Sequence, residues 1–493
     1  MNERITAQIC EKSMSGDFTT EISMPDYEPE IRRLLRVGVT LTPPLGFSDG
    51  GRVGMNGEII YNVLYMGNDG QLYSTKTRES YELAEALKQL EKGEEITGII
   101  CSVFPDSVVS RAVAPRKISI KCKLKGTAKA FGWQEIAEKS TYIENPDSIE
   151  RLQGEAVYSE IFPSVTAEAV LSEDFTPDVP ISGDLRIITH TSAAVCESIE
   201  PSHGDAVVKG SLVLSVLAAV DDSDEKPFRI TKKMPFAERV EADWLTPASK
   251  CIAEVCPTEC EFGVEDNRIA CEVGILIKLD SEEERRAVYT RDIYSTEVYS
   301  ETTVARYEHP LSKRCFSGNF TSSLREELDT AGITDGAEVA DATAVSVVKN
   351  IEFNDDKMAL VGETLLNLLI NTQNEYSTKE FKIPFRYETE CGKTDQSITD
   401  CRVVSLPPRA KIDSGRILCD CELCFSGRIY EKSYFDALDQ VVFGDRIEKD
   451  NAITVCFPSP TDSLWDVSKR YHIPTERIIS QESQLKKQEP IVF

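Results

Sequence analysis

Apolar and polar residues alternate along most of the chain, which is the pattern of β-strands that are buried on one face. In the segment 117–122, Ile118, Ile120 and Cys122 fall on one strand face and the intervening polar residues fall on the other. Turn sequences such as Asn68-Asp69-Gly70 separate the alternating segments. The pattern predicts a mainly β protein built from sandwiches or open barrels.

A short helix is expected early in this β-rich region. After Pro29, Ile31, Leu34 and Leu35 recur at helical spacing. We therefore expect a helix to precede the strand predicted at 57–65.

Four landmarks recur three times, in the same order and at a spacing of about 150 residues. Repeats of solenoid proteins run about 20–50 residues, so this spacing indicates tandem domains. We expect three β-rich modules, at residues 1–155, 156–300 and 301–447. The landmarks are Ser-x-x-Phe-Thr motifs at 15–19, 172–176 and 317–321, glycine-led strands at 57–65, 210–217 and 362–369, prolines at 105, 257 and 407, and strands at 117–122, 268–273 and 416–421.

The segment 453–493 has a different pattern, which predicts a strand, two short helices and a strand. Thr461, Asp462 and Ser463 offer side-chain oxygens that can cap the first helix. One face of that helix is largely apolar and should form much of the core of so small a domain. The expected core residues are Leu464, Val467, Ile473 and Ile478, whereas Trp465 lies beside this stripe and fits either a core or a contact role.

The composition argues against several classes of function. The 493 residues carry a net charge of −28, from 83 acidic and 55 basic residues, so binding to nucleic acid or to an anionic membrane surface is not expected. No glycine-rich segment lies between a predicted strand and a helix, and the four histidines are not paired at metal-binding spacing. We expect no catalytic residue, no metal site and no cofactor.

Two features of the sequence bear on the compartment. The segment 1–12 lacks the basic start and apolar stretch of a secretion signal, and the most apolar run, 212–220, is too short to span a bilayer. A cytoplasmic protein is expected, without membrane insertion. Its 15 cysteines should then be reduced thiols.

Two clusters of cysteines, at 251–271 and 419–424, raise the question of a zinc site, which needs four ligands. In the alignment of the three copies, however, Cys256 corresponds to Phe104 and Leu406. Cysteines that exchange with large apolar residues act as small buried hydrophobes, so a core role is expected. The alignment leaves Cys251, Cys260 and Cys424 unexplained.

Two parts of the chain resemble known families. The segment Pro25-Asp26-Tyr27-Glu28-Pro29-Glu30-Ile31, the strand at 57–65 and the segment Tyr289–Ser295 together resemble the SPOCS domain of endospore-forming clostridia, and 453–493 resembles a LysM domain. Copies two and three lack the Pro-Asp-Tyr-x-Pro-x-Ile motif, so their assignment rests on internal spacing. Several SPOCS modules followed by one LysM domain is the architecture of SipL-like spore morphogenesis proteins.

The resemblance implies a non-enzymatic spore coat assembly factor in the cytoplasm of the mother cell, at the forespore surface. It implies that the LysM domain binds the spore coat morphogenetic ATPase SpoIVA, with the other modules making further contacts to coat proteins. The residues expected on the partner-binding surface of the LysM domain are Phe457, Thr461, Asp462, Trp465, Ser480 and Gln481.

Two alternatives remain open. LysM domains commonly bind N-acetylglucosamine polymers, through loops that here correspond to 457–462 and 480–487, so a peptidoglycan-binding cell-wall protein is the first. Thr461 stands in place of the usual glycine, and Ser480 or Gln481 in place of the usual asparagine, which weighs against glycan binding. The second alternative is a hydrolase or metalloprotein within the β-rich modules.

Overall fold

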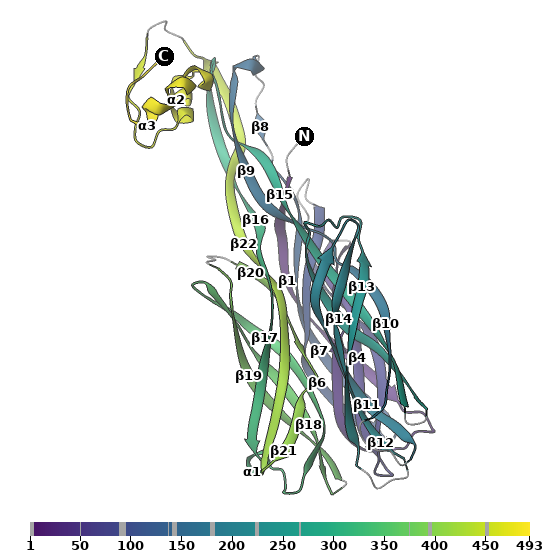
Figure 1. Cartoon of the computed structure of the whole chain (residues 1–493). Coiled ribbons are helices and arrows are strands. Elements are labelled where there is room, and N and C mark those ends of the chain that lie inside the picture. The colour runs from purple at the N-terminus through teal and green to yellow at the C-terminus, as the bar shows by residue number, and fades with distance from the viewer. Residues whose placement is uncertain are drawn as a thin grey trace.

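The computed structural model describes residues 4–49, 51–87, 95–136, 138–140, 145–177, 183–221, 226–265, 268–373, 375–392, 397–448 and 453–493. The protein is mainly β, as the alternating sequence predicts, and its strands form several antiparallel sheets. Long strands run side by side through an elongated body, and a small helical region lies at one end (Figure 1). No helix in the described ranges is long and apolar enough to cross a membrane.

The first part of the chain forms a pair of sheets, which we call unit one. One sheet has the order β1-β7-β6, and in the other β4 pairs with β2, β3 and β5. Apolar residues from both sheets, such as Tyr61, Val63, Ile118 and Ile120, share one core. The strands are β1 (Arg4–Ser23), β2 (Ile31–Leu41), β3 (Leu45–Asp49), β4 (Arg52–Gly67), β5 (Leu72–Ala86), β6 (Glu95–Ala114) and β7 (Lys117–Glu135).

The same strand order occurs in unit two, where β10-β15-β14 faces β11-β12-β13 across a second core. A further strand, β9, extends the first sheet by pairing with the end of β15. The strands are β9 (Ile149–Ile161), β10 (Val165–Phe175), β11 (Leu185–Pro201), β12 (Asp205–Val220), β13 (Phe228–Glu241), β14 (Lys250–Glu265) and β15 (Arg268–Ser295). The short strand β8 (Lys139–Ser140) and the turn η1 (Pro146–Ser148) join units one and two.

Unit three repeats the arrangement, with β16-β22-β20 facing β17-β18-β19 across a third core. The predicted boundaries between modules, after residues 155 and 300, fall within strands β9 and β16. The module boundaries stay predictions. The elements are β16 (Val298–Glu327), α1 (Leu328–Ala331), β17 (Glu338–Asn354), β18 (Lys357–Thr372), β19 (Glu375–Glu390), β20 (Ser397–Ser405), β21 (Arg409–Asp413) and β22 (Arg416–Arg446).

The recurring glycine has a packing reason that is the same in each unit. Gly57 pairs with Tyr81, Gly210 with Phe236, and Gly362 with Phe385, so an aromatic ring lies across each glycine. A Cβ atom at Gly57 would lie 2.7 Å from the Tyr81 hydroxyl oxygen, and one at Gly210 would lie 2.6 Å from the Phe236 ring and closer still to the Val195 carbonyl oxygen. The ring covers the backbone that the glycine leaves bare, and any larger residue would displace it.

Equivalent residues from the three units meet in one apolar cluster. Leu64, Leu217 and Leu369 each lie seven residues after the recurring glycine, and all three are 0–1% exposed within the same cluster. The strand facing each leucine carries a β-bulge at the matching place, which turns Leu35, Ile188 and Ala340 toward the same cluster. The units are therefore packed together around a shared core.

A buried ion pair lies beside this cluster. Arg36 of unit one donates to Asp341 of unit three at 2.7 Å, with both side chains less than 10% exposed. Arg229 of unit two lies 3.6 Å from the other Asp341 oxygen and donates to the Pro408 and Ala342 carbonyls. One carboxylate therefore joins all three units.

The helix expected after Pro29 is not present, and this prediction was wrong. Residues 31–41 form strand β2. The pairing of β2 with β4 shifts between Ile31 and Arg33 and again between Leu34 and Arg36. Each bulge adds one residue to the strand, which converts the alternating apolar spacing into one that imitates a helix.

The segment 453–493 forms a small region with its own core, which includes Val467, Ile473 and Ile478 as predicted. Ser463 caps the first helix in a reciprocal pair of hydrogen bonds with Asp466. The segment 480–487, expected as a loop, instead contains a helix. The elements are β23 (Val455–Cys456), α2 (Leu464–Tyr471), η2 (Thr475–Arg477), η3 (Ile479–Gln481), α3 (Glu482–Lys486) and β24 (Ile491–Val492), with β23 paired to β24.

The shared core predicts a sharp difference between two leucines of β18. Replacing Leu369, which is fully buried, with alanine should lower the free energy of unfolding by about 2–5 kcal/mol. Replacing Leu365, which is 39% exposed, should cost less than about 1 kcal/mol. Urea denaturation of the full chain measures both, and equal losses would contradict the shared core.

Candidate interaction surface of the C-terminal region

The C-terminal region is fastened to the far end of β15 through helix α2. The Tyr294 hydroxyl donates to the Ile473 carbonyl at 2.7 Å, and its ring meets that of Trp465 edge-on, with centroids 4.9 Å apart. His472 Nδ1 lies 3.0 Å from the Ser295 carbonyl oxygen, and the His472 ring meets that of Tyr299 edge-on. The partners on β15 belong to the segment Tyr289–Ser295 that the sequence singled out.

Asp292 is the charged centre of this contact. Lys469 Nζ donates to both carboxylate oxygens, at 2.6 and 2.8 Å, and Trp465 Nε1 donates at 2.7 Å. Burial by itself would raise the pKa of Asp292, but the hydrogen bonds from Lys469 and Trp465 outweigh it and hold the pKa below its usual value. The carboxylate therefore stays ionised at neutral pH and anchors α2 by charge as well as by packing.

The six residues predicted on the partner-binding surface fall into different environments. Trp465 is only 9% exposed and is occupied by its contacts with β15. Asp462 is held within the region by a two-pronged ion pair with Arg470 and by the Ser459 amide. Gln481 exchanges two hydrogen bonds with the backbone of Val492. The remaining three, Phe457, Thr461 and Ser480, are exposed.

Exposed apolar side chains gather on the two-stranded sheet and beside it. Val455 and Val492 are directly paired across β23 and β24 and are 49% and 48% exposed. Phe457 lies directly after β23, two residues past Val455, and is 74% exposed. Ile479, which sequence reasoning did not select, is 57% exposed two residues before Gln481. An exposed phenylalanine beside other apolar residues is typical of a protein contact.

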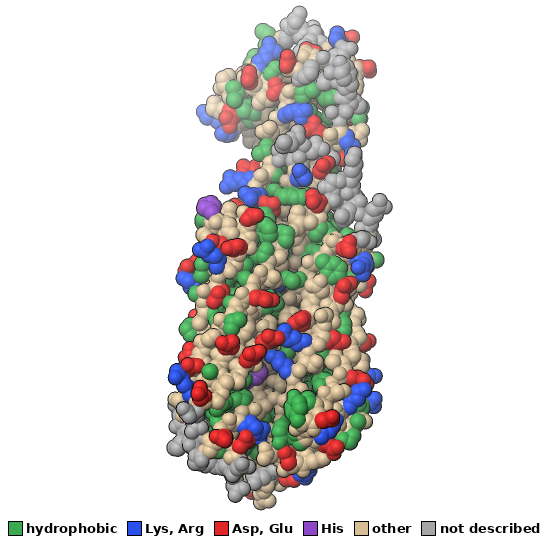
Figure 2. Space-filling view, turned by 90° about the vertical axis from the view of Figure 1, so that its right-hand side faces the viewer, with side chains coloured by type: hydrophobic (Ala, Val, Ile, Leu, Met, Phe, Trp, Pro, Cys, Tyr) green, Lys and Arg blue, Asp and Glu red, His purple; other side chains and the backbone are tan. Residues whose placement is uncertain are grey.

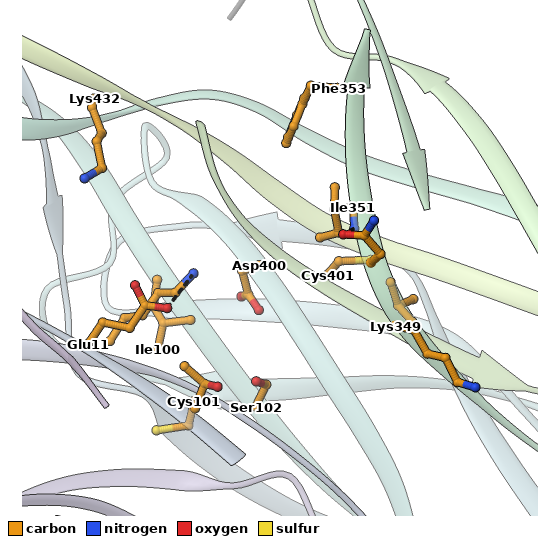
Figure 3. Close-up of a pocket in the computed structure, with 14 residues that line it drawn as sticks. Glu11, Ile100, Cys101, Ser102, Lys349, Ile351, Phe353, Asp400, Cys401 and Lys432 are labelled. Carbon is orange, nitrogen blue, oxygen red and sulfur yellow. Dashed lines mark hydrogen bonds and ion pairs between the residues drawn. The ribbon is translucent and has the colours of Figure 1, made fainter. Parts of the chain in front are cut away.

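A cleft of about 610 Å³ lies between units one and three (Figure 3). Its lysines are already paired, Lys129 with Glu11, Lys349 with Glu363 and Lys432 with Glu308. Burial raises the pKa of the Cys101 and Cys401 thiols to about 12, so neither is a thiolate nucleophile at neutral pH. The side chains that line the cleft offer no activated nucleophile with an adjacent base.

Buried charges lie next to this cleft, where units two and three meet. Arg402 donates to Asp280 at 2.7 Å and lies 3.2 Å from Glu254. Arg428 lies 3.5 Å from Glu282, and both are fully buried. Burial opposes ionisation of Asp280, but Lys278, Arg402 and Arg428 lower its pKa below the usual value. The two arginines belong to unit three, whereas Asp280, Glu254 and Glu282 belong to unit two, so these ion pairs join the two units.

The cysteines behave as the alignment of the copies predicts. Cys122, Cys271, Cys419 and Cys421 are at most 2% exposed and belong to the cores of the units. Cys256 is also buried, and burial raises its pKa to about 12. Of those without an explanation from the sequence, Cys251 and Cys260 pack against the core of unit two.

Acidic and basic side chains are interspersed over the visible face of the body, and no single-sign patch dominates it (Figure 2). No protein family, curated protein or solved structure matches this chain.

The Asp292 contact predicts a local change on mutation. Replacing Asp292 with asparagine should make the amides of α2 exchange hydrogen at least about tenfold faster, because a charge-assisted hydrogen bond is lost. The matched control is Asp436→Asn, an exposed position on β22. Hydrogen exchange followed by mass spectrometry measures both, and unchanged exchange in Asp292→Asn would contradict the anchoring role.

The same contact predicts a dependence on pH. A carboxylate whose pKa is lowered by folding contributes its full stabilisation above the unfolded value of about 3.9 and loses it as the pH falls through the native pKa. Exchange of the α2 amides, corrected for the intrinsic effect of pH, should therefore be constant between about pH 5 and 7 and rise below about pH 4.

Proposed function

We propose that this protein is a non-enzymatic spore coat assembly factor that acts by docking other proteins at the forespore surface. In this proposal, units one to three are SPOCS modules and the C-terminal region is a LysM domain that binds the coat ATPase SpoIVA. The protein works in the cytoplasm of the mother cell and needs no cofactor.

The observation that carries the proposal is the way in which the C-terminal region is held. Its α2 face is used within the chain, through Asp292, Tyr294 and Trp465. The side chains of Phe457, Val455 and Val492, by contrast, are 74%, 49% and 48% exposed. A domain that is anchored on one side and bears exposed apolar residues elsewhere suits the presentation of a binding surface to a partner.

The three units support a scaffold role for a separate reason. Their shared core and the ion pairs of Asp341 fix them relative to one another, so contacts made by different units have a defined spacing. Several weak contacts on one rigid body gain avidity when their spacing matches the target. The paired charges of the cleft between units one and three do not favour an enzyme there.

Deletion of residues 453–493 tests the proposal directly. In a pull-down with purified ATPase, the truncated chain should lose capture relative to the full chain, because its binding domain is gone. Undiminished capture would contradict docking through the C-terminal region. Circular dichroism of the truncated chain controls for folding of units one to three, which have their own cores.

A point variant makes the test sharper. Phe457→Ala should weaken capture by at least about tenfold if this exposed ring is an anchor of the interface. The control Val170→Ala changes a residue that is 65% exposed on β10 of unit two and should have no effect. Titration with N-acetylglucosamine oligomers distinguishes the glycan-binding alternative, since saturable glycan binding that Phe457→Ala removes would favour that alternative instead.

A further inference from the structure

The second half of β6 is an exposed strand edge. In its sheet, β6 pairs with β7 on one side, and no described strand pairs with it on the other. Residues 106–109 and 111–115 are all exposed, with Val109 64% and Val113 43% exposed. The upper part of the strand is covered, since Ile100 packs with Ile161 of unit two. The open edge is therefore limited to the segment between Pro105 and Pro115.

Open edges that bear apolar residues readily pair with another strand. Proline is a common device that prevents such pairing, because it lacks a backbone donor. Here the two prolines bound the exposed segment and leave its centre free of them. The edge is therefore available for pairing over a short and defined stretch.

On the outer face of this segment, the charges are arranged so that they match those of an antiparallel copy of the same segment. Val109 and Arg111 lie opposite Lys121 and Ser119 of β7, on the face away from the core residues Ile118 and Ile120. Asp106 lies at a bulge, and its carboxylate reaches Lys125 at 2.8 Å, on the same outer face. Along the strand, the outer face therefore presents the acidic Asp106, then Val109, and then the basic Arg111.

A second copy of this chain fits such an edge. Two antiparallel strands related by a two-fold axis keep their outer faces on the same side, so a central residue meets its own copy. With the axis at Val109, Arg111 of each copy lies opposite Ser107 of the other and next to Asp106. Arg111 makes no ion pair with any residue in the described ranges, so it is available for this contact.

We propose that the protein forms a two-fold symmetric dimer in which the β6 edges of two copies pair antiparallel about Val109. The two sheets β1-β7-β6 then become one continuous sheet across the dimer. Val109 packs against its copy at the axis, and two Arg111–Asp106 pairs flank it. This inference does not depend on the proposed function, since it concerns self-association of the chain.

Charge reversal gives a decisive test by sedimentation equilibrium of the full chain. The wild type should show a concentration-dependent mass that approaches twice that of one chain at about 100 μM, as suits a short interface. Asp106→Arg alone and Arg111→Asp alone should each weaken the dimer by at least tenfold, since like charges then face each other. An equimolar mixture of the two variants should recover the dimer, because each arginine again meets an aspartate.

Matched controls separate this interface from a general effect of charge. Lys382→Asp makes the same charge change as Arg111→Asp at an exposed position on β19 and should leave the mass unchanged. Val109→Lys should abolish the dimer, whereas Val170→Lys, at a position that is 65% exposed on β10, should not. Circular dichroism spectra that match the wild type show that each variant is folded.

A wild-type chain that stays monomeric at about 100 μM would overturn the proposal. So would single variants that dimerise like the wild type, or a mixture that does not recover the dimer. A dimer that is weakened by Lys382→Asp or Val170→Lys as much as by changes on β6 would point to another surface and would likewise overturn it.

Discussion

The carboxylate of Asp341 is the contact on which the arrangement of the three units depends. It is buried, it pairs with Arg36 of unit one at 2.7 Å, and it lies 3.6 Å from Arg229 of unit two. Removing one partner from a buried ion pair typically costs about 3–5 kcal/mol, because the remaining charge is left without compensation. The three leucines of the shared core supply apolar attraction, which is not directional, whereas the Asp341 pairs require each unit to take one position.

This constraint has a consequence at the far end of the molecule. Strands β15, β16 and β22 continue beyond the cores of their units and pair with one another or with β9 as far as residues 295 and 446. Because these strands start in the fixed body, the platform formed by Asp292, Tyr294 and Ser295 is held in place as well. The C-terminal region is thus carried at a set position and orientation, with Phe457 exposed.

Local features of the sequence predicted local features of the structure. The alternation of apolar and polar residues identified the strand at 117–122. The recurring glycine marked the central strand in the second sheet of each unit. The helix cap at Ser463 could also be predicted, because its partner Asp466 lies only three residues along the chain. The bulges in β2 gave 31–35 an apolar spacing like that of a helix. Part of the repeat alignment also differs from the structure. Phe18 lies opposite Cys122 but Phe175 lies opposite Ile269, so the first-strand motifs are not in structural register.

Contacts between distant residues could not be predicted. Trp465 was ambiguous because its partner Asp292 lies 173 residues away, and only the fold brings the two together. The shared core is a similar case, since its leucines look like ordinary strand residues in each copy. The exposed edge of β6 was also hidden, because the alternating pattern identifies a strand without showing whether it lies at the edge of a sheet.

The most direct test of the account is a hydrogen-exchange footprint of the full chain with and without the coat ATPase. We expect new protection at 457–462, around the exposed Phe457, and no change in α2 or at 292–295, which are already in contact. Protection confined to α2, or faster exchange there on binding, would mean that the partner displaces the Asp292 contact. That result, or the absence of any footprint, would contradict the account.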